Sequence, residues 1–189
     1  VISGISEKLH TIIIKDGDSI IGKVISNSNN QWSFTPTISL IDGPHLITAT
    51  DIDAKSKIGT STPIADTKAF LVDATAPTIT GTTIGQNNST LTVTLSEPVF
   101  NTTGGSGALE PSDFSLSING GAVTAVVASD ISISGNAYTL GLTLTGTPTG
   151  TEVLTIVPSS ATAIYDAAGN AASTTQSNNI VTLIDMSTF

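Results

Sequence analysis

The stretch Leu71-Val72-Asp73-Ala74-Thr75-Ala76-Pro77-Thr78-Ile79-Thr80 divides the chain into two halves. Apolar runs lie on both sides of a short segment that carries one carboxylate and one proline. Pro77 has a fixed φ and no backbone N–H, and it favours an extended conformation at Ala76. The stretch therefore predicts the last strand of one domain, a short semi-rigid linker and the first strand of the next. We expect domains at residues 1–73 and 74–189.

The composition predicts an all-β fold with a packed core. Of the 189 residues, 39% are hydrophobic, and 17 glycines and 8 prolines interrupt runs that are rich in Thr, Ser, Val and Ile. Branched residues favour strands, whereas Gly and Pro favour the turns between them. Each half contains about seven short runs separated by turn residues, so we expect two tandem Ig-like β-sandwich domains.

The charge balance excludes several classes of partner. Six basic residues stand against fifteen acidic ones, which gives a net charge of −9. Nucleic-acid-binding surfaces are basic, so we expect no nucleic-acid partner, whereas an acidic surface favours a soluble monomer and divalent cations. No apolar run approaches the eighteen or so residues of a membrane span, so we expect no membrane insertion. The chain has no cysteine, which excludes disulfides and thiolate metal sites and, in an Ig-like fold, favours a bacterial extracellular protein.

The first half contains six predicted strands. They cover residues 1–5, 10–15, 20–24, 32–35, 45–50 and 68–72. The turn Asp16-Gly17-Asp18 predicts a hairpin between the second and third of these strands. We expect Trp32, the single tryptophan, to be a core residue between two sheets rather than a sugar-stacking platform. His10 and His45 have no neighbour pattern that indicates catalysis, and we expect half-exposed strand residues.

The second half contains seven predicted strands. They cover residues 79–84, 91–95, 114–118, 122–128, 138–144, 152–157 and 179–184. We expect the strands at 114–118 and 122–128 to pair as a hairpin around Asn119-Gly120-Gly121. The segment 158–179 is long for a loop in a compact domain, and such loops are often functional or stabilised by a ligand.

Several phrases resemble bacterial Ig-like (BIg-type) repeats of large cell-surface adhesins. These phrases cover residues 16–22, 31–36, 40–50 and 72–77 in the first half, and residues 95–100, 107–114, 135–140 and 165–170 in the second. The resemblance implies tandem β-sandwiches on a bacterial cell surface, next to further Ig-like repeats of the same chain. In that family a loop reading Asp-Ala-Ala-Gly-Asn usually follows the strand equivalent to 45–50, whereas this chain has Asp53-Ala54-Lys55-Ser56-Lys57.

Four side chains are predicted to converge at one pole of the second domain. Asp73 precedes its first strand, Glu97 follows the second strand, and Asp166 and Asn170 lie in the loop before the last strand. In an Ig-like strand order these places share one pole. Three close carboxylates repel one another unless a cation joins them, and calcium takes six to eight oxygen ligands. We expect a calcium ion at the interdomain linker, the alternative being solvated turn residues.

Two further sets of acidic residues could contribute to cation sites. Asp16, Asp18, Asp51 and Asp53 form a second acidic group in the sequence, for which a cation site is a weaker expectation. Asp185 closes the last strand as Asp73 closes the first domain. It is therefore expected to repeat the role of Asp73 for a following domain.

No residue pattern predicts an enzyme. The sequence has no Gly-x-Ser-x-Gly or His-Glu-x-x-His motif and no thiol. A carboxylate pair such as Glu97 and Asp166 could in principle hydrolyse a glycoside, but a neighbouring domain at that pole would leave little room for a polysaccharide. We therefore expect non-catalytic spacer modules of an adhesin. The alternative is a cell-adhesion module that binds a glycan or peptide through loops of the second domain. An aromatic content of 4% favours the spacer.

Overall fold

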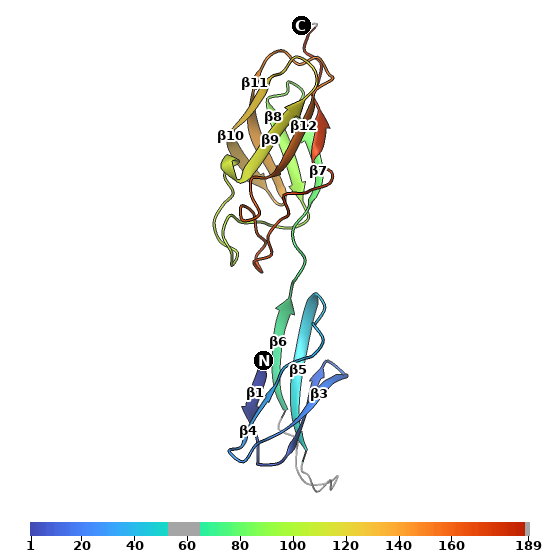
Figure 1. The fold of residues 1–189 in the computed structure, drawn as a ribbon, viewed down its shortest axis with the longest axis vertical. Helices are drawn as coiled ribbons and strands as arrows, with labels where there is room; N and C mark the ends of the chain where they lie inside the picture. The colour runs from blue at the N-terminus through green and yellow to red at the C-terminus, as the bar shows by residue number, and fades with distance from the viewer. Residues whose placement is uncertain (53–64, 188–189) are drawn as a thin grey trace. The chain divides into compact units, whose positions relative to one another are not determined.

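The computed structural model describes residues 1–52 and 65–187, and this part of the chain is all-β. The chain forms two compact units, Val1–Ala74 and Thr75–Phe189, which are the blue-to-green and green-to-red parts of Figure 1. All strand pairs are antiparallel. The described residues include no helix long and apolar enough to cross a membrane.

The first unit is a sandwich of a two-stranded and a four-stranded sheet. Its strands are β1 (Ile2–Ile5), β2 (Thr11–Asp16), β3 (Ser19–Ile25), β4 (Gln31–Phe34), β5 (Gly43–Ile52) and β6 (Ala65–Val72). The small sheet pairs β1 with β4, and the large sheet has the order β3-β2-β5-β6. The predicted hairpin is confirmed, because β2 and β3 pair directly across the turn that follows Asp16.

The core of the first unit lies between these two sheets. Ile12 and Ile14 of β2 and Ile47 of β5 point inward from the large sheet, and Trp32 of β4 covers them from the small sheet. The prediction of a core tryptophan is therefore confirmed. Residues 53–57, whose sequence differs from the Asp-Ala-Ala-Gly-Asn that the resemblance implies, lie outside the described residues.

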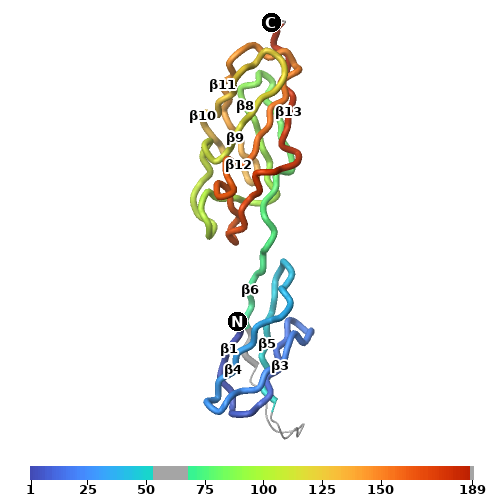
Figure 2. The backbone as a smooth tube through the Cα atoms, viewed as in Figure 1, coloured from blue at the N-terminus to red at the C-terminus, as the bar shows by residue number. Residues whose placement is uncertain are grey.

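The second unit is a sandwich of a four-stranded and a three-stranded sheet. Its elements are β7 (Ile79–Ile84), β8 (Thr90–Leu95), the 3₁₀ turn η1 (Pro111–Asp113), β9 (Phe114–Asn119), β10 (Ala125–Ser134), β11 (Ala137–Thr145), β12 (Val153–Pro158) and β13 (Ile180–Thr182). The sheets have the orders β10-β11-β8-β7 and β13-β12-β9. Figure 2 shows the backbone path through both layers.

Alternating side chains build the core of the second unit. Leu91, Val93 and Leu95 of β8 are buried, as their spacing predicts. They pack in the same cluster as Leu154 and Ile156 of β12, which face them from the other sheet. Burial of such side chains is the main stabilising term of a sandwich with no disulfide.

The predicted hairpin around Asn119-Gly120-Gly121 is wrong. β9 pairs with β12 and β10 pairs with β11, so the two strands belong to different sheets. The chain crosses between the layers at the two glycines, which both adopt positive φ. β10 also begins later than predicted and extends to Ser134. Local sequence favours a turn here, but the sheet that each strand joins is decided by its distant partners.

Candidate metal centre

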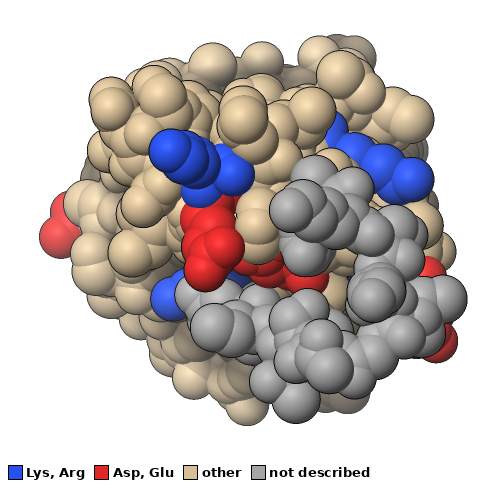
Figure 3. Space-filling view, turned by 90° about the horizontal axis from the view of Figure 1, so that it is seen from below, with Lys and Arg blue, Asp and Glu red and all other residues tan. Residues whose placement is uncertain are grey.

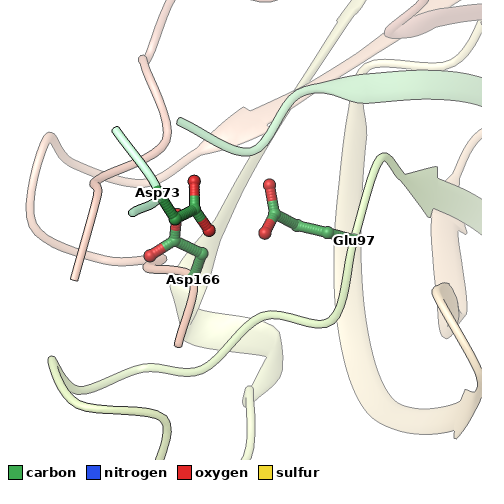
Figure 4. Close-up of side chains that lie close together, drawn as sticks. All are labelled: Asp73, Glu97 and Asp166. Atoms are coloured by element: carbon green, nitrogen blue, oxygen red, sulfur yellow. The ribbon is translucent and has the colours of Figure 1, made fainter. Parts of the chain in front are cut away.

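Three of the four predicted ligands lie together in the structure. Ligand oxygens of Asp73, Glu97 and Asp166 all lie within 4.8 Å of one another, and Figure 4 shows the three carboxylates around one point. Asp73 comes from the segment between β6 and β7, Glu97 follows β8, and Asp166 lies in the loop between β12 and β13. Asp166 is buried, and the other two carboxylates are partly exposed.

The loop that carries Asp166 is held by its own backbone. Oδ1 of Asp166 accepts hydrogen bonds from the N–H groups of Gly169 at 2.7 Å and Asn170 at 2.8 Å. The N–H of Asp166 donates in turn to the carbonyl of Asn170 at 3.1 Å. Gly169 has a φ of +96°, a conformation that side chains with a Cβ disfavour. The tight turn expected from this glycine is present, and it fixes the carboxylate of Asp166.

Hydrogen bonds to β11 and to the loop of Asp166 hold the segment that follows Glu97. The hydroxyl of Tyr138, a buried residue of β11, accepts from the N–H of Val99 at 3.2 Å and donates to its carbonyl at 3.3 Å. Phe100 and Tyr165 exchange backbone hydrogen bonds of 2.7 and 2.8 Å. These bonds join the segment after Glu97 directly to the loop of Asp166.

Backbone hydrogen bonds also bind the linker to the second unit. The N–H of Thr78 donates to the hydroxyl of Ser96 at 3.0 Å, and the N–H of Ser96 donates to the carbonyl of Thr78 at 2.9 Å. Pro77 is buried. The end of the linker is therefore fixed next to the residue that precedes Glu97.

Asn170 lies beside the three carboxylates, but it supports Asp166 in this arrangement. Its side-chain nitrogen donates to Oδ2 of Asp166 at 2.7 Å. A rotation of the side-chain amide by 180° exchanges its nitrogen and oxygen positions, so the same residue can offer Oδ1 to an ion. Asn170 thus adjoins the cluster as a hydrogen-bond partner of one of its members.

The second unit has no basic side chain that could neutralise this cluster. Residues 75–189 contain no Lys, Arg or His. Their carboxylates are Glu97, Glu110, Asp113, Asp130, Glu152, Asp166 and Asp185. Two unit charges 4 Å apart repel each other by about 4 kcal/mol at an effective dielectric constant of about 20. The cluster can hold a metal ion, and an all-oxygen donor set suits a hard cation.

The second acidic group expected from the sequence does not form a single cluster. Asp16 pairs with Ile47 at one end of the β2–β5 ladder, and Asp51 pairs with Ile12 near the other end. Four residues along a strand span about 13 Å. Asp53 lies outside the described residues. Asp16 and Asp51 therefore cannot share one ion, and each of them contacts a histidine instead.

His45 is buried rather than half-exposed, which corrects the expectation from the sequence. Its Nδ1 lies 2.5 Å from a carboxylate oxygen of Asp16, and its Nε2 lies 2.7 Å from the carbonyl oxygen of Ile41. The ring stacks on Phe70 at a centroid distance of 5.8 Å. The carbonyl of Ile41 and then the carboxylate of Asp16 raise the pKa of His45 above its usual value. No local pattern indicates this pair, because the register of β2 and β5 creates it.

His10 lies between two carboxylates of the first unit. Its Nδ1 is 2.8 Å from Asp51, and its Nε2 is 3.3 Å from Glu7. Ser6 donates to the other oxygen of Asp51 at 2.6 Å.

Figure 3 shows lysine side chains beside aspartate and glutamate side chains on one face of the molecule. Charges of opposite sign are thus interspersed on this surface.

Glu152 is a fully buried carboxylate that the sequence did not single out. It accepts hydrogen bonds from the N–H of Ala122 at 2.7 Å and of Thr149 at 3.0 Å, and from the hydroxyl of Thr149 at 3.1 Å. Burial opposes its ionisation, but these bonds and one from its own N–H outweigh burial and lower its pKa to about 2. A threonine three residues before a glutamate is the spacing of a capping box, but a strand follows here. That spacing is the one local signal for the contact.

Asp185 follows β13 and binds its own neighbour. Its Oδ1 accepts from the N–H of Ser187 at 2.8 Å and from its hydroxyl at 2.7 Å. These bonds lower the pKa of Asp185. Its role for a following domain stays a prediction.

No protein-family model matches the chain, and no curated protein matches it.

Proposed function

We propose that the chain is a non-catalytic spacer of a bacterial cell-surface adhesin, stiffened by calcium at the linker between its domains. The observation that carries the proposal is the cluster of Asp73, Glu97 and Asp166, because one of its members belongs to the linker. An ion bound there would tie Asp73 to two loops of the second unit. A spacer needs such a joint, since a fixed linker transmits orientation from one domain to the next.

Calcium is the cation that this donor set favours. Three carboxylates supply at least three oxygens, and backbone carbonyls, Asn170 and water can complete the six to eight ligands of calcium. Magnesium requires a stricter octahedral geometry and keeps more of its water. Calcium is also abundant outside the cell, where we place the protein. The neighbouring Ig-like repeats of the same chain are its proposed partners.

The burial of Asp166 supports a structural role over a catalytic one. A carboxylate that is 0% exposed and accepts three hydrogen bonds is poorly placed to exchange protons with a substrate. Aromatic side chains give little support to a glycan-binding role, because Trp32 and Tyr138 are buried and Tyr165 is only partly exposed. The spacer is therefore the function that the geometry favours.

Thermal unfolding in millimolar calcium and in excess chelator tests the metal site. A ligand at one hundred times its Kd is expected to raise the Tm of the second unit by about 10 °C. Glu97→Gln and Asp73→Asn should each remove most of this shift, because each variant loses one charged ligand. Asp130→Asn, which changes an exposed carboxylate of the same unit outside the cluster, should keep it. An equal Tm in calcium and chelator would refute the metal site.

NMR relaxation of the linker amides tests the stiffening separately. Calcium should raise the backbone order parameters at residues 74–76 toward about 0.85, the value of rigid backbone. Binding without any change in these order parameters would leave a metal site but refute its role in the joint.

A further inference from the structure

β9 and β10 follow each other in the sequence, yet each is the edge strand of a different sheet. Among the described strands, β9 pairs only with β12 and β10 only with β11. Alternate residues of a strand point their N–H and C=O groups to opposite sides. Each of these two strands therefore presents hydrogen-bonding groups away from its partner. Such an edge is a template for an added strand.

An open groove of about 720 Å³ runs between the two edges. Phe114 and Leu116 line it from β9, and Val126 and Val127 line it from β10. Val126 is partly buried against the core, whereas Val127 on the opposite face of the strand is 61% exposed. The edge of β10 thus offers apolar surface on both of its faces. An added strand of alternating side chains could pack on both.

The rim of the groove is acidic. Glu110 lines it and is exposed, and Asp113, which is partly exposed, lies between the lining residues Ser112 and Phe114. Residues 75–189 contain no basic side chain to offset these charges. A partner with Lys or Arg next to its apolar residues would therefore be complementary in charge, whereas an acidic partner would be repelled.

We propose that the groove between β9 and β10 binds an extended, basic peptide segment of a partner protein by strand addition. The backbone edge supplies hydrogen bonds, the apolar lining receives alternate side chains, and the acidic rim selects basic residues. About six residues of the segment are engaged, the length of an ordinary strand. A second copy of this chain is a poorer occupant, because two copies each carry a net charge of −9. The site is independent of calcium and of the linker.

The first experiment titrates the isotope-labelled chain with a synthetic peptide at low salt. The probe is Lys-Thr-Val-Thr-Val-Thr-Val-Lys-Lys, and the matched control peptide carries Glu in place of each Lys. We expect amide shifts confined to β9, β10 and η1, and slower hydrogen exchange along β10 when the Lys peptide is bound. The Glu peptide should bind at least about tenfold more weakly, because like charges meet at the rim. Shifts elsewhere in the chain, or equal binding of both peptides, would overturn the proposal.

Two matched variants on one strand locate the site. Val127→Arg adds a positive charge inside the groove and should weaken binding of the Lys peptide about tenfold or more. Ile133→Arg adds the same charge on β10 at a residue that is 50% exposed and does not line the groove, so its affinity should stay close to that of the parent chain. Equal loss in both variants would overturn the assignment. Sedimentation of the chain alone as a dimer that Val127→Arg dissociates would assign the groove to a second copy instead.

Discussion

The two units share an architecture but balance their carboxylates in opposite ways. All six lysines and both histidines lie in residues 1–74, whereas residues 75–189 contain none. In the first unit Asp16 contacts His45, and Asp51 contacts His10. In the second unit Glu152 is held by backbone N–H groups, and Glu97 and Asp166 lie close to Asp73 of the linker.

The same sandwich fold therefore accommodates carboxylates away from bulk solvent in two ways, with histidine in the first unit and with backbone N–H groups in the second. A histidine is a charge partner only while it is protonated, so we expect the stability of the first unit to depend on pH through His45. Backbone N–H groups never lose their protons in this range, so Glu152 stays ionised down to strongly acidic pH. For the cluster at the linker we propose a metal ion, because Asp73, Glu97 and Asp166 bring three carboxylates together and residues 75–189 contain no Lys, Arg or His.

The largest effect should come from removing the buried carboxylate of the second unit. Glu152→Ala leaves the N–H groups of Ala122 and Thr149 without their acceptor inside the protein, and we expect the Tm of the second unit to fall by roughly 10 °C or more. Asp130→Ala, at an exposed position, is the control and should change the Tm by much less. Scanning calorimetry measures both. A small effect of Glu152→Ala would mean that water replaces the carboxylate.

The effect of Glu152→Ala on the Tm of the second unit should depend on pH. The pKa of Glu152 is lowered from 4.5 to about 2 in the folded protein, so its stabilising contribution is present above pH 4.5 and is lost as the pH falls toward 2. The difference in Tm between the parent chain and Glu152→Ala should therefore shrink over this window.

A pair of glycine variants separates contact with Glu152 from backbone strain. Gly121 and Gly135 have nearly equal φ angles of +60° and +59°, so alanine should cost about 1 kcal/mol of strain at either. A Cβ at Gly121 would lie 1.9 Å from Oε1 of Glu152, whereas nothing lies within 4 Å at Gly135. Gly121→Ala should therefore lower the Tm of the second unit clearly more than Gly135→Ala. Equal losses would show that the carboxylate moves aside freely.

The smallest effect is a pH dependence of the first unit. The pKa of His45 is raised by the carbonyl of Ile41 and the carboxylate of Asp16. Its contribution to stability is complete below pH 6.5, the usual pKa of histidine, and is lost as the pH rises through the higher pKa of the folded state. We expect the Tm of the first unit to fall by a few degrees as the pH rises above 6.5. His45→Gln should abolish this slope, and a slope unchanged in that variant would assign it to another group.

Local sequence patterns predicted most strands of both units. The alternation of Leu91, Val93 and Leu95 and the turn after Asp16 depend only on near neighbours, and both appear in the structure as expected. The sequence also named Asp73, Glu97 and Asp166, because strand order alone places the start of one strand and two loops at one pole. In such cases the physical cause is local, or it follows from the fold class.

The sequence did not determine which strands pair, and several contacts depend on that choice. β9 and β10 join different sheets because pairing with β12 and with β11 is more favourable than pairing with each other across the short turn. The separation of Asp16 from Asp51 and the burial of His45 follow from the register of β2 and β5. Glu152 meets Ala122 from thirty residues away. Composition and periodicity therefore determined the class of fold and the candidate ligands, whereas pairing between distant strands decided the charge partners, because register is a property of two strands and not of either one alone.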